Sequence, residues 1–242
     1  MGEGNDFVRV LIGPSVERLL KPVAGEHVLD IACGNGNYCR WLADLGLTAV
    51  GVDLSSVFVE RATERSGEYG DRIRYAVLDA TDGDALADVV GAPFDAVMCN
   101  MAMMDMAEID PMLQTLPKLL KPEGRFVFSI THPCFNTMGM AKVAEEVDVN
   151  GDLRTQYSVK VWRYKTPTSG KGLGMVGQPR PQYYFDRPLE VLLGACFEAG
   201  FVVEGLEEPS FPPGTTVTRP LGWSNFHELP PVLVVRLGLR RH

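Results

Sequence analysis

Residues 28–43, VLDIACGNGNYCRWLA, restrict the possible folds of this chain more than any other stretch. An apolar run reaches an acid, Asp30, and then passes through Gly34 and Gly36 into a segment with a helical pattern. A strand that turns through glycines directly into a helix is typical of an open α/β sheet. The glycines let the backbone approach a ligand closely, and the amide groups of the turn point toward it. The sequence therefore predicts a ligand site immediately after this strand.

Strand and helix patterns continue to alternate through the first half of the chain. Nearly continuous apolar strands separated by helices are typical of a parallel sheet that is covered on both faces. Ser55 is expected to cap one helix, and Pro117 is expected to interrupt another. The expected strands are 27–32, 47–53, 72–79, 94–100 and 124–131, and the expected helices are 37–45, 55–66, 83–90 and 109–120.

The alternation stops after the fifth strand. Residues 135–185 contain no good helix pattern, only the alternating stretch LRTQYSVKVWRYK and then a Gly-rich stretch. We interpret 135–185 as an insertion that covers the substrate, within a single domain over residues 1–242. The earlier pattern then returns, with Asp186 as the expected cap of the next helix. That last part consists of a helix, two strands and the Pro-rich loop between the strands, at 187–199, 201–207, 232–239 and 209–231.

The composition restricts the partners of the protein. The 242 residues include 23 Lys and Arg against 31 Asp and Glu, which gives a formal net charge of −8. Proteins that bind nucleic acid through phosphates usually present a basic face, so we expect a small-molecule acceptor and no nucleic acid. No apolar stretch approaches the ~20 residues of a membrane helix, and the N-terminus lacks the pattern of a signal peptide. We expect a cytoplasmic protein without membrane contact, either a monomer or a homodimer.

The five cysteines give no sign of a metal site. No CxxC pair occurs, and no histidine follows a cysteine at the spacing of metal ligands. We therefore expect reduced, mostly buried thiols and no bound metal.

The first turn distinguishes between two classes of cofactor. A dinucleotide site follows the pattern G-x-G-x-x-G, in which the last glycine lets the helix pack closely on the strand. Here the run is GNGNYC, with Cys39 in the last place. Asp30 would repel a pyrophosphate but attract an ammonium group. The ligand should therefore carry a positive group and no phosphate, as S-adenosylmethionine does.

At this point the sequence resembles the class I S-adenosylmethionine-dependent methyltransferases of small-molecule type. The motifs that carry the resemblance are VLDIACGNGNYCRWLA, VGVDLS, LDATD, FDAVMCNMAMMDM and LLKPEGRFVFSI, in that order. The first motif departs from the family pattern at Ala32, where a glycine is usual. The resemblance implies an α/β fold with a seven-stranded Rossmann-like sheet, mostly parallel with an antiparallel last strand. Helices would cover both faces, and a β-rich insertion or lid would follow the fifth strand.

The same resemblance implies the residues that bind the cofactor. Asp53 would accept hydrogen bonds from the ribose hydroxyls, Asp79 would meet the adenine amino group, and Asn100 would lie near the sulfonium. The alternative for Asp53 and Asp79 is that they only cap helices or close turns. The full expected set is Asp30, Ala32, Cys33, Gly34, Asn35, Gly36, Asp53, Leu54, Asp79, Ala80, Asn100 and Met101.

His132 is the candidate catalytic residue. It follows the fifth strand, at the carboxyl edge of the sheet where ligands of open α/β sheets bind. Its imidazole could accept a proton from an acceptor hydroxyl or amine near neutral pH. The alternative is that His132 only orders a turn or orients the cofactor. Methyl transfer can also proceed without a base, because in-line positioning of an activated methyl group supplies much of the rate.

The expected acceptor site lies under the insertion. Aromatic and methionine side chains suit a flat, amphipathic acceptor, and the Gly-rich residues 169–177 suggest a mobile lid. The alternative is an edge strand that packs its own aromatic side chains. The expected acceptor-binding residues are Met104, Tyr157, Trp162, Tyr184 and His227.

The sequence leaves three functions open. The first is S-adenosylmethionine-dependent methyl transfer to a small organic acceptor at O, N or C, with S-adenosylhomocysteine as the product. The second is an NAD(P)-dependent oxidoreductase, against which Asp30 and the missing third glycine argue. The third is a protein that binds the cofactor without catalysis.

Overall fold

A seven-stranded sheet forms the centre of the computed structural model, which describes residues 5–91, 93–174, 178–217 and 219–240. Its strand order is β10-β11-β5-β4-β1-β2-β3. The pairs β4–β5, β1–β4, β1–β2 and β2–β3 are parallel, whereas β11 runs antiparallel to both β5 and β10. The predicted mostly parallel sheet with an antiparallel last strand is confirmed. The strands of this sheet are β1 His27–Ile31, β2 Thr48–Asp53, β3 Ile73–Val77, β4 Phe94–Asn100, β5 Leu120–Thr131, β10 Phe201–Glu207 and β11 Val232–Leu239.

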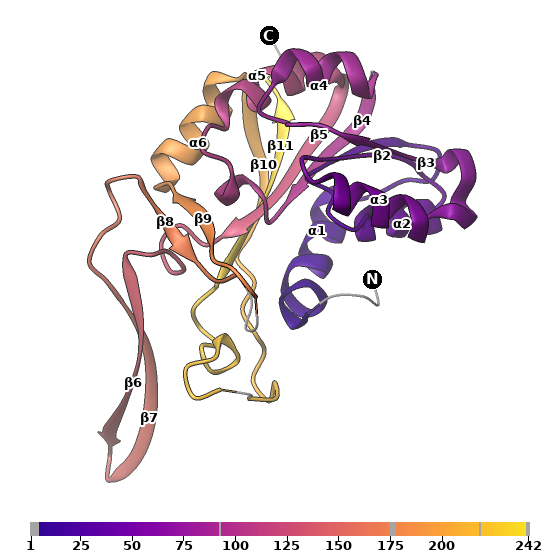
Figure 1. Cartoon of the computed structure of the whole chain (residues 1–242). Coiled ribbons are helices and arrows are strands. Elements are labelled where there is room, and N and C mark those ends of the chain that lie inside the picture. The colour runs from indigo at the N-terminus through magenta and orange to yellow at the C-terminus, as the bar shows by residue number, and fades with distance from the viewer. Residues whose placement is uncertain (1–4, 92, 175–177, 218, 241–242) are drawn as a thin grey trace.

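Helices cover both faces of the sheet, as Figure 1 shows. One apolar core lies between the sheet and α4, α5 and α6, and a second lies between the sheet and α1 and α2. The helices are α1 Gly13–Leu20, α2 Asn37–Asp44, α3 Ser56–Arg65, α4 Gly83–Val90, α5 Asp110–Leu119 and α6 Leu189–Glu198, with the shorter η1 Phe7–Ile12, η2 Gly67–Arg72, η3 Met103–Asp105 and η4 Trp223–Asn225. No helix in the described part of the chain combines the length and the apolar character needed to cross a membrane.

The β-rich insertion after β5 consists of two hairpins. Strands β6 (Met140–Val149) and β7 (Asp152–Val161) form one, and β8 (Thr168–Gly172) and β9 (Gln182–Asp186) form the other. Figure 1 shows both hairpins beyond the end of the β5 arrow, together with the loop that precedes β11. The insertion therefore lies at the carboxyl edge of the parallel strands.

Part of the expected lid is a paired strand. Residues 168–172 form β8, and its glycines allow close packing: a Cβ at Gly172 would lie 3.2 Å from the Tyr184 ring, and one at Gly170 would lie 2.7 Å from the sulfur of Met138. Residues 175–177 of the Gly-rich stretch lie outside the described residues.

Three local expectations need comment. Ser55 caps α3, because its hydroxyl accepts from the Phe58 amide at 3.3 Å. Asp186 does not cap α6: it ends β9 and accepts from the Met138 amide at 2.7 Å, while Pro188 occupies the N-cap position. Pro117 does not interrupt α5, which continues through it to Leu119.

Candidate functional site

The turn after β1 brings the backbone close to the end of β2. Gly34 and Gly36 both have positive φ, at 54° and 73°. At Gly36 a side chain has no room, since a Cβ would lie 2.1 Å from the Tyr75 hydroxyl oxygen. Ala32, which stands where the related family usually has glycine, also has a positive φ of 56°. Three residues of the turn therefore adopt left-handed backbone angles. Two of them are glycines, and the third, Ala32, is of a type that disfavours this conformation.

Asp53 fastens this turn to the end of β2. Its Oδ2 accepts from the Gly34 amide at 2.9 Å, and its Oδ1 accepts from the Ser55 amide at 2.9 Å. The structure thus brings Asp53 and the glycine turn together, two members of the expected cofactor-binding set. Leu54, the next residue, is 70% exposed.

Asp30 lies inside the protein. It is 1% exposed, and the Cys39 thiol donates to its Oδ2 at 3.4 Å. Burial raises the pKa of Asp30 to about 7, and the negative charge of Asp53 adds to this effect. A buried carboxyl group near neutrality is poised to become charged when a cation binds beside it.

The end of β4 forms a second group of polar atoms. The Ser129 hydroxyl donates to Asn100 Oδ1 at 3.0 Å, and the Met101 amide donates to the Ser129 carbonyl at 2.9 Å. Asn100 Nδ2 is buried and has no partner in the described structure. Met101, like Ala32, has a positive φ, of 51°. The backbone therefore turns sharply at the carboxyl ends of both β1 and β4, which are neighbours in the sheet.

Tyr38 was not among the expected site residues. It stands in the first turn of α2, and its hydroxyl is buried without a hydrogen-bond partner in the described structure. Burial raises the pKa of Tyr38, and the charge of Asp30 raises it further. The oxygen Oδ1 of Asn35 is also buried and unpartnered. The sequence GNGNYC contained both residues, but only the folded chain shows that their polar atoms lack partners.

Asp79 closes a turn after β3. Its Oδ1 accepts from the Thr81 amide at 2.9 Å and from the Thr81 hydroxyl at 2.7 Å. Asp79 is exposed, whereas Ala80 is buried. This geometry matches the alternative that the sequence left open for Asp79. Because a carboxylate accepts several hydrogen bonds, Asp79 can also accept one from an adenine amino group.

Both ring nitrogens of His132 are already engaged. The Cys134 amide donates to Nδ1 at 3.1 Å, so the ring proton resides on Nε2, which faces Glu208 Oε1 at 2.8 Å. The residue is 1% exposed, and burial lowers its pKa despite the opposing effect of Glu208. This arrangement corresponds to the alternative that His132 orders a turn.

Arg187 holds the segment that follows β4. Its guanidinium donates to the carbonyl oxygens of Met106 at 2.6 Å, Ala107 at 2.8 Å and Met103 at 3.1 Å. Burial lowers the pKa of Arg187. Met104, in the same segment, is 5% exposed and packs in the core with the partly buried Tyr184.

Asp105, in the segment after β4, is a further residue that was not among the expected site residues. The Gln182 amide group donates to its Oδ1 at 3.1 Å. Burial nevertheless raises the pKa of Asp105 to about 6. Burial also raises the pKa of Tyr184, and the charge of Asp105 adds to that rise. The acid in MAMMDM could have been noticed, because it follows the fourth strand directly.

The other expected acceptor residues lie on the insertion and on the late loop. Tyr157 packs 5.3 Å from Phe226, measured between ring centroids, and Trp162 is 64% exposed. His227 Nδ1 lies 2.8 Å from the Phe211 carbonyl oxygen, so this histidine fastens the late loop to itself. The structure does not bring these three residues into one site with Tyr184.

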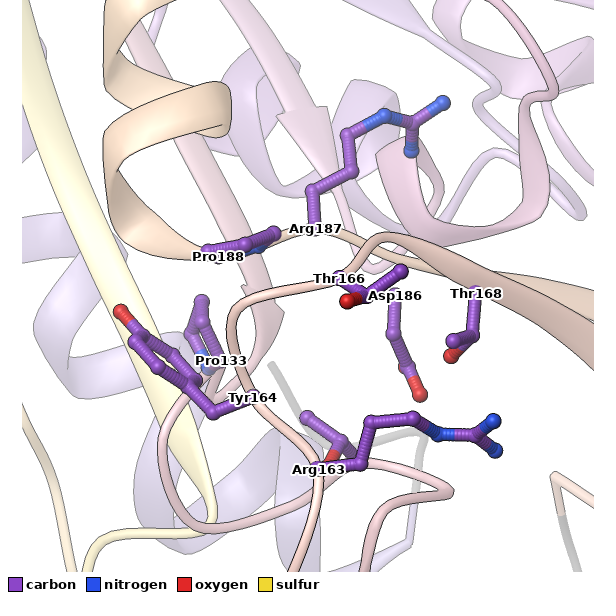
Figure 2. A pocket seen from close by; sticks show the side chains of 9 residues that line it. Pro133, Arg163, Tyr164, Thr166, Thr168, Asp186, Arg187 and Pro188 are labelled. Atoms are coloured by element: carbon purple, nitrogen blue, oxygen red, sulfur yellow. The ribbon is translucent and has the colours of Figure 1, made fainter.

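A shallow pocket opens beside the turn after β5. It encloses about 210 Å³, part of it open to solvent. Figure 2 shows Asp186 pointing toward Arg163 in this pocket, while Arg187 points away from it. Burial raises the pKa of Asp186, and the charge of Arg163 opposes that rise. The lining residues are Pro133, Thr137, Arg163, Tyr164, Thr166, Thr168, Asp186, Arg187 and Pro188.

Part of the chain is similar in sequence to known methyltransferases. Residues 28–124 match the family model described as "Methyltransferase domain". The ubiquinone biosynthesis O-methyltransferases of Chelativorans sp. (strain BNC1) and Bartonella bacilliformis are each 33% identical to this chain, over 129 and 128 residues. These matches cover 53% and 52% of this chain and 49% and 50% of the relatives. The chain therefore spans about half the length of the curated relatives it matches.

Solved structures extend the likeness to nearly the whole chain. An S-adenosylmethionine-dependent methyltransferase from Mesorhizobium loti superposes with a TM-score of 0.71 at 23% identity, covering 93% of this chain and 95% of that one. The glycopeptide N-methyltransferase MtfA, in complex with S-adenosyl-L-homocysteine, gives a TM-score of 0.61 at 15% identity, covering 94% and 88%. At these identities the likeness shows the fold. Residues 28–124 thus resemble a methyltransferase domain, and the described chain has the fold of these S-adenosylmethionine-dependent methyltransferases.

Proposed function

We propose that this protein transfers a methyl group from S-adenosylmethionine to a small organic acceptor at O, N or C, and that it releases S-adenosylhomocysteine. The proposal takes residues 1–242 as one methyltransferase domain, in which the insertion at 135–185 covers the acceptor. The names of the relatives support this reaction class: the curated relatives are O-methyltransferases, and MtfA is an N-methyltransferase. The net charge of −8 favours a small acceptor over nucleic acid.

The observation that carries the proposal is a set of buried polar atoms without partners. Asn35 Oδ1 and the Tyr38 hydroxyl belong to the turn and helix that follow β1, and Asn100 Nδ2 belongs to the last residue of β4. Buried polar atoms are nearly always hydrogen-bonded in native proteins, so these atoms indicate a ligand with its own donors and acceptors. The ammonium and carboxylate of S-adenosylmethionine supply both kinds, and buried Asp30 is suited to the ammonium.

Each residue near the turn has a proposed role toward this cofactor. The cofactor itself supplies an activated methyl group on its sulfonium. Asp53 remains able to accept from ribose hydroxyls while it holds Gly34, because each carboxylate oxygen has two lone pairs. Asp79 would meet the adenine, and Asn100 with Met101 would lie beside the sulfonium. In-line positioning of the acceptor would then supply much of the rate.

The role of His132 as a general base requires one bond to open. Its Nδ1 can accept a proton from the acceptor only after it releases the Cys134 amide. A His132→Asn variant separates the two roles. Loss of a base would lower kcat and remove the acidic limb of the pH profile, whereas loss of an ordered turn would mainly lower the unfolding temperature.

Calorimetric titration with S-adenosylmethionine, S-adenosylhomocysteine and NADPH tests the cofactor. We expect micromolar binding of the first two and none of NADPH. Asp53→Ala should abolish that binding, and Tyr38→Phe should weaken it without lowering the unfolding temperature, because it removes an unpaired buried hydroxyl. Asp71→Ala is the matched control, since it removes an exposed acid in η2 far along the chain from the turn.

The outcomes distinguish the three functions. Binding of NADPH in place of the adenosyl compounds would support an oxidoreductase and overturn the proposal. Binding of S-adenosylmethionine without transfer of a radiolabelled methyl group to any member of a phenol, amine and enol library would support a protein that binds the cofactor without catalysis.

A further inference from the structure

The β6–β7 hairpin projects from the rest of the molecule. Its strands pair over ten residues each, from Met140 opposite Val161 to Val149 opposite Asp152. Figure 1 shows this ribbon pointing away from the sheet and the helices. A two-stranded ribbon on its own is marginally stable in water, because it buries little apolar surface. A projecting ribbon of this length is therefore expected to gain stability from a partner.

In the part of the chain that the structure describes, the half of the hairpin remote from its turn packs on other segments. There the Tyr157 ring lies 5.3 Å from the Phe226 ring, and the Lys142 ammonium lies 4.8 Å above the Trp223 ring. Residues 152–156 of β7 are all exposed, with Leu153 at 73%. Trp162, directly after the other end of β7, is 64% exposed. Large apolar side chains that are exposed near both ends of one strand indicate a surface that a partner covers.

The outer edge of β7 is free to pair with another strand. Within the described chain β7 pairs with β6 alone, so the backbone groups on its other edge have no strand opposite them. Such an edge is a template for a further strand. We propose that two copies of this chain join along these edges and form a four-stranded antiparallel sheet, with Gln156 of one copy opposite Gln156 of the other.

The charges along β7 favour this register. When Gln156 faces its own copy, Asp152 of each copy lies opposite Lys160 of the other, so symmetry produces the ion pair twice. Arg154 then faces Ser158, and Leu153 faces Val159. Moving the centre to Tyr157 would instead set Arg154 against Lys160, which places like charges opposite each other.

The edge of β6 is less suited to pairing with itself. Its single lysine, Lys142, is already held above the Trp223 ring. The outer half of β6 carries three acids, Glu145, Glu146 and Asp148, and two copies of this half would repel each other.

The proposed register also reaches the pocket of Figure 2. It places the hairpin turn at Asn150 of the second copy opposite Trp162, so the exposed indole becomes covered. Trp162 directly precedes Arg163, which lines that pocket. Each copy would therefore complete the rim of the pocket in the other copy.

Sedimentation velocity over micromolar to submillimolar concentrations tests this dimer with two charge reversals. Asp152→Lys and Lys160→Asp each create two like-charge pairs, so each variant alone should have a dissociation constant raised at least ~10-fold. An equimolar mixture of the two variants should dimerise again, because every facing pair then has opposite charges. Glu145→Lys, on the opposite strand, is the matched control and should leave the dimer unchanged.

Dimerisation of the equimolar mixture would show that both variants are folded, so the weaker association of each variant alone could not come from a folding defect. Far-UV circular dichroism checks each variant, and a chain that carries both reversals should dimerise with itself if either single variant misfolds. A wild-type protein that stays monomeric over the whole range would overturn the proposal. So would a dimer that persists in both single variants, or single variants that remain monomeric when mixed although both are folded.

Discussion

At the scale of single residues, the turn after β1 contains an alanine in a conformation that suits glycine. Ala32 has a φ of 56°, and the left-handed region costs a residue with a Cβ roughly 1–2 kcal/mol. Glycine loses somewhat more entropy on folding, which offsets part of that gain. We expect Ala32→Gly to raise the free energy of unfolding by about 0.5–1 kcal/mol, measured by urea denaturation. Ala195→Gly, inside α6, should lower it by about 1 kcal/mol. Destabilisation by both substitutions would show that Ala32 is not strained.

Asp30 should link stability and binding to pH. Its pKa is about 7 in the folded protein against an ordinary 3.8, so the folded state holds a proton that the unfolded state has lost. Stability from this group is complete below pH 4 and is lost as the pH rises toward 7 and above. One pKa unit corresponds to about 1.4 kcal/mol, so the loss is on the order of 4 kcal/mol. Asn cannot ionise, and Asp30→Asn should therefore be the more stable protein at pH 8 and close to wild type at pH 4.

Paired denaturation curves at pH 4, 6 and 8 measure this difference, because all other titrating groups are common to both proteins. A gap between the two curves that stays constant with pH would contradict the prediction. The same variant should bind S-adenosylmethionine more weakly, and wild type should release a proton on binding near pH 6, which calorimetry in buffers of different ionisation enthalpy detects.

The proximity of the residues around the turn after β1 could be predicted because they are close in sequence. Asp30, Gly34 and Gly36 occupy one strand and one turn, and Asp53 ends the next strand along the chain. The partners of other residues depend on the completed fold. His132 meets Glu208 across 76 positions, and Arg187 meets Met103 across 84. No local pattern indicates such pairs, so the sequence predicts neither the contact of His132 with Glu208 nor that of Arg187 with Met103.

At the scale of elements, the segment after β4 depends on Arg187. Its guanidinium donates to carbonyl oxygens of three residues in this segment. A lysine keeps the charge but cannot reach them all, because it lacks the planar fork of the guanidinium. We expect Arg187→Lys to cost about 2–3 kcal/mol of unfolding free energy and to speed hydrogen exchange in residues 103–107.

Arg154→Lys is the control for this substitution, since the side chain of Arg154 is 64% exposed and its ion pair with Asp152 is long, at 3.4 Å. It should change stability by less than about 0.5 kcal/mol. Equal effects of the two substitutions would mean that the contacts of Arg187 add little.

The parallel strands were the most predictable elements, because burial on both faces leaves a nearly continuous apolar run in the sequence. The hairpins were harder to predict. Strand β6 mixes acids with small apolar residues and has no fully buried residue, so burial imposes little pattern on it. Strand β8 reads as a flexible Gly-rich segment, yet its glycines serve close packing against Tyr184 and Met138.

At the scale of the whole molecule, the sheet and the projecting hairpin should be energetically separate. The two apolar cores lie against the sheet, and the outer half of the hairpin contributes no fully buried side chain to them. Glu145 and Gln156 face each other across the ribbon, so an Asn-Gly turn can replace residues 146–155 and close a shorter hairpin.

This shortened chain should keep its unfolding temperature within a few degrees of wild type, because the removed residues bury little apolar area. Its affinity for S-adenosylmethionine should also be unchanged, since the residues proposed to bind this cofactor lie at the ends of β1, β2 and β4. Differential scanning calorimetry measures the unfolding temperature, and titration calorimetry measures the affinity for S-adenosylmethionine. Both proteins should be measured at a concentration at which wild type is monomeric, so that dimer dissociation does not contribute. A large fall in the unfolding temperature of the monomer would show that the hairpin stabilises the sheet directly. A fall in cofactor affinity alone would show that the hairpin influences the turn after β1 within one chain. Either result would contradict the prediction that the hairpin and the sheet are energetically separate.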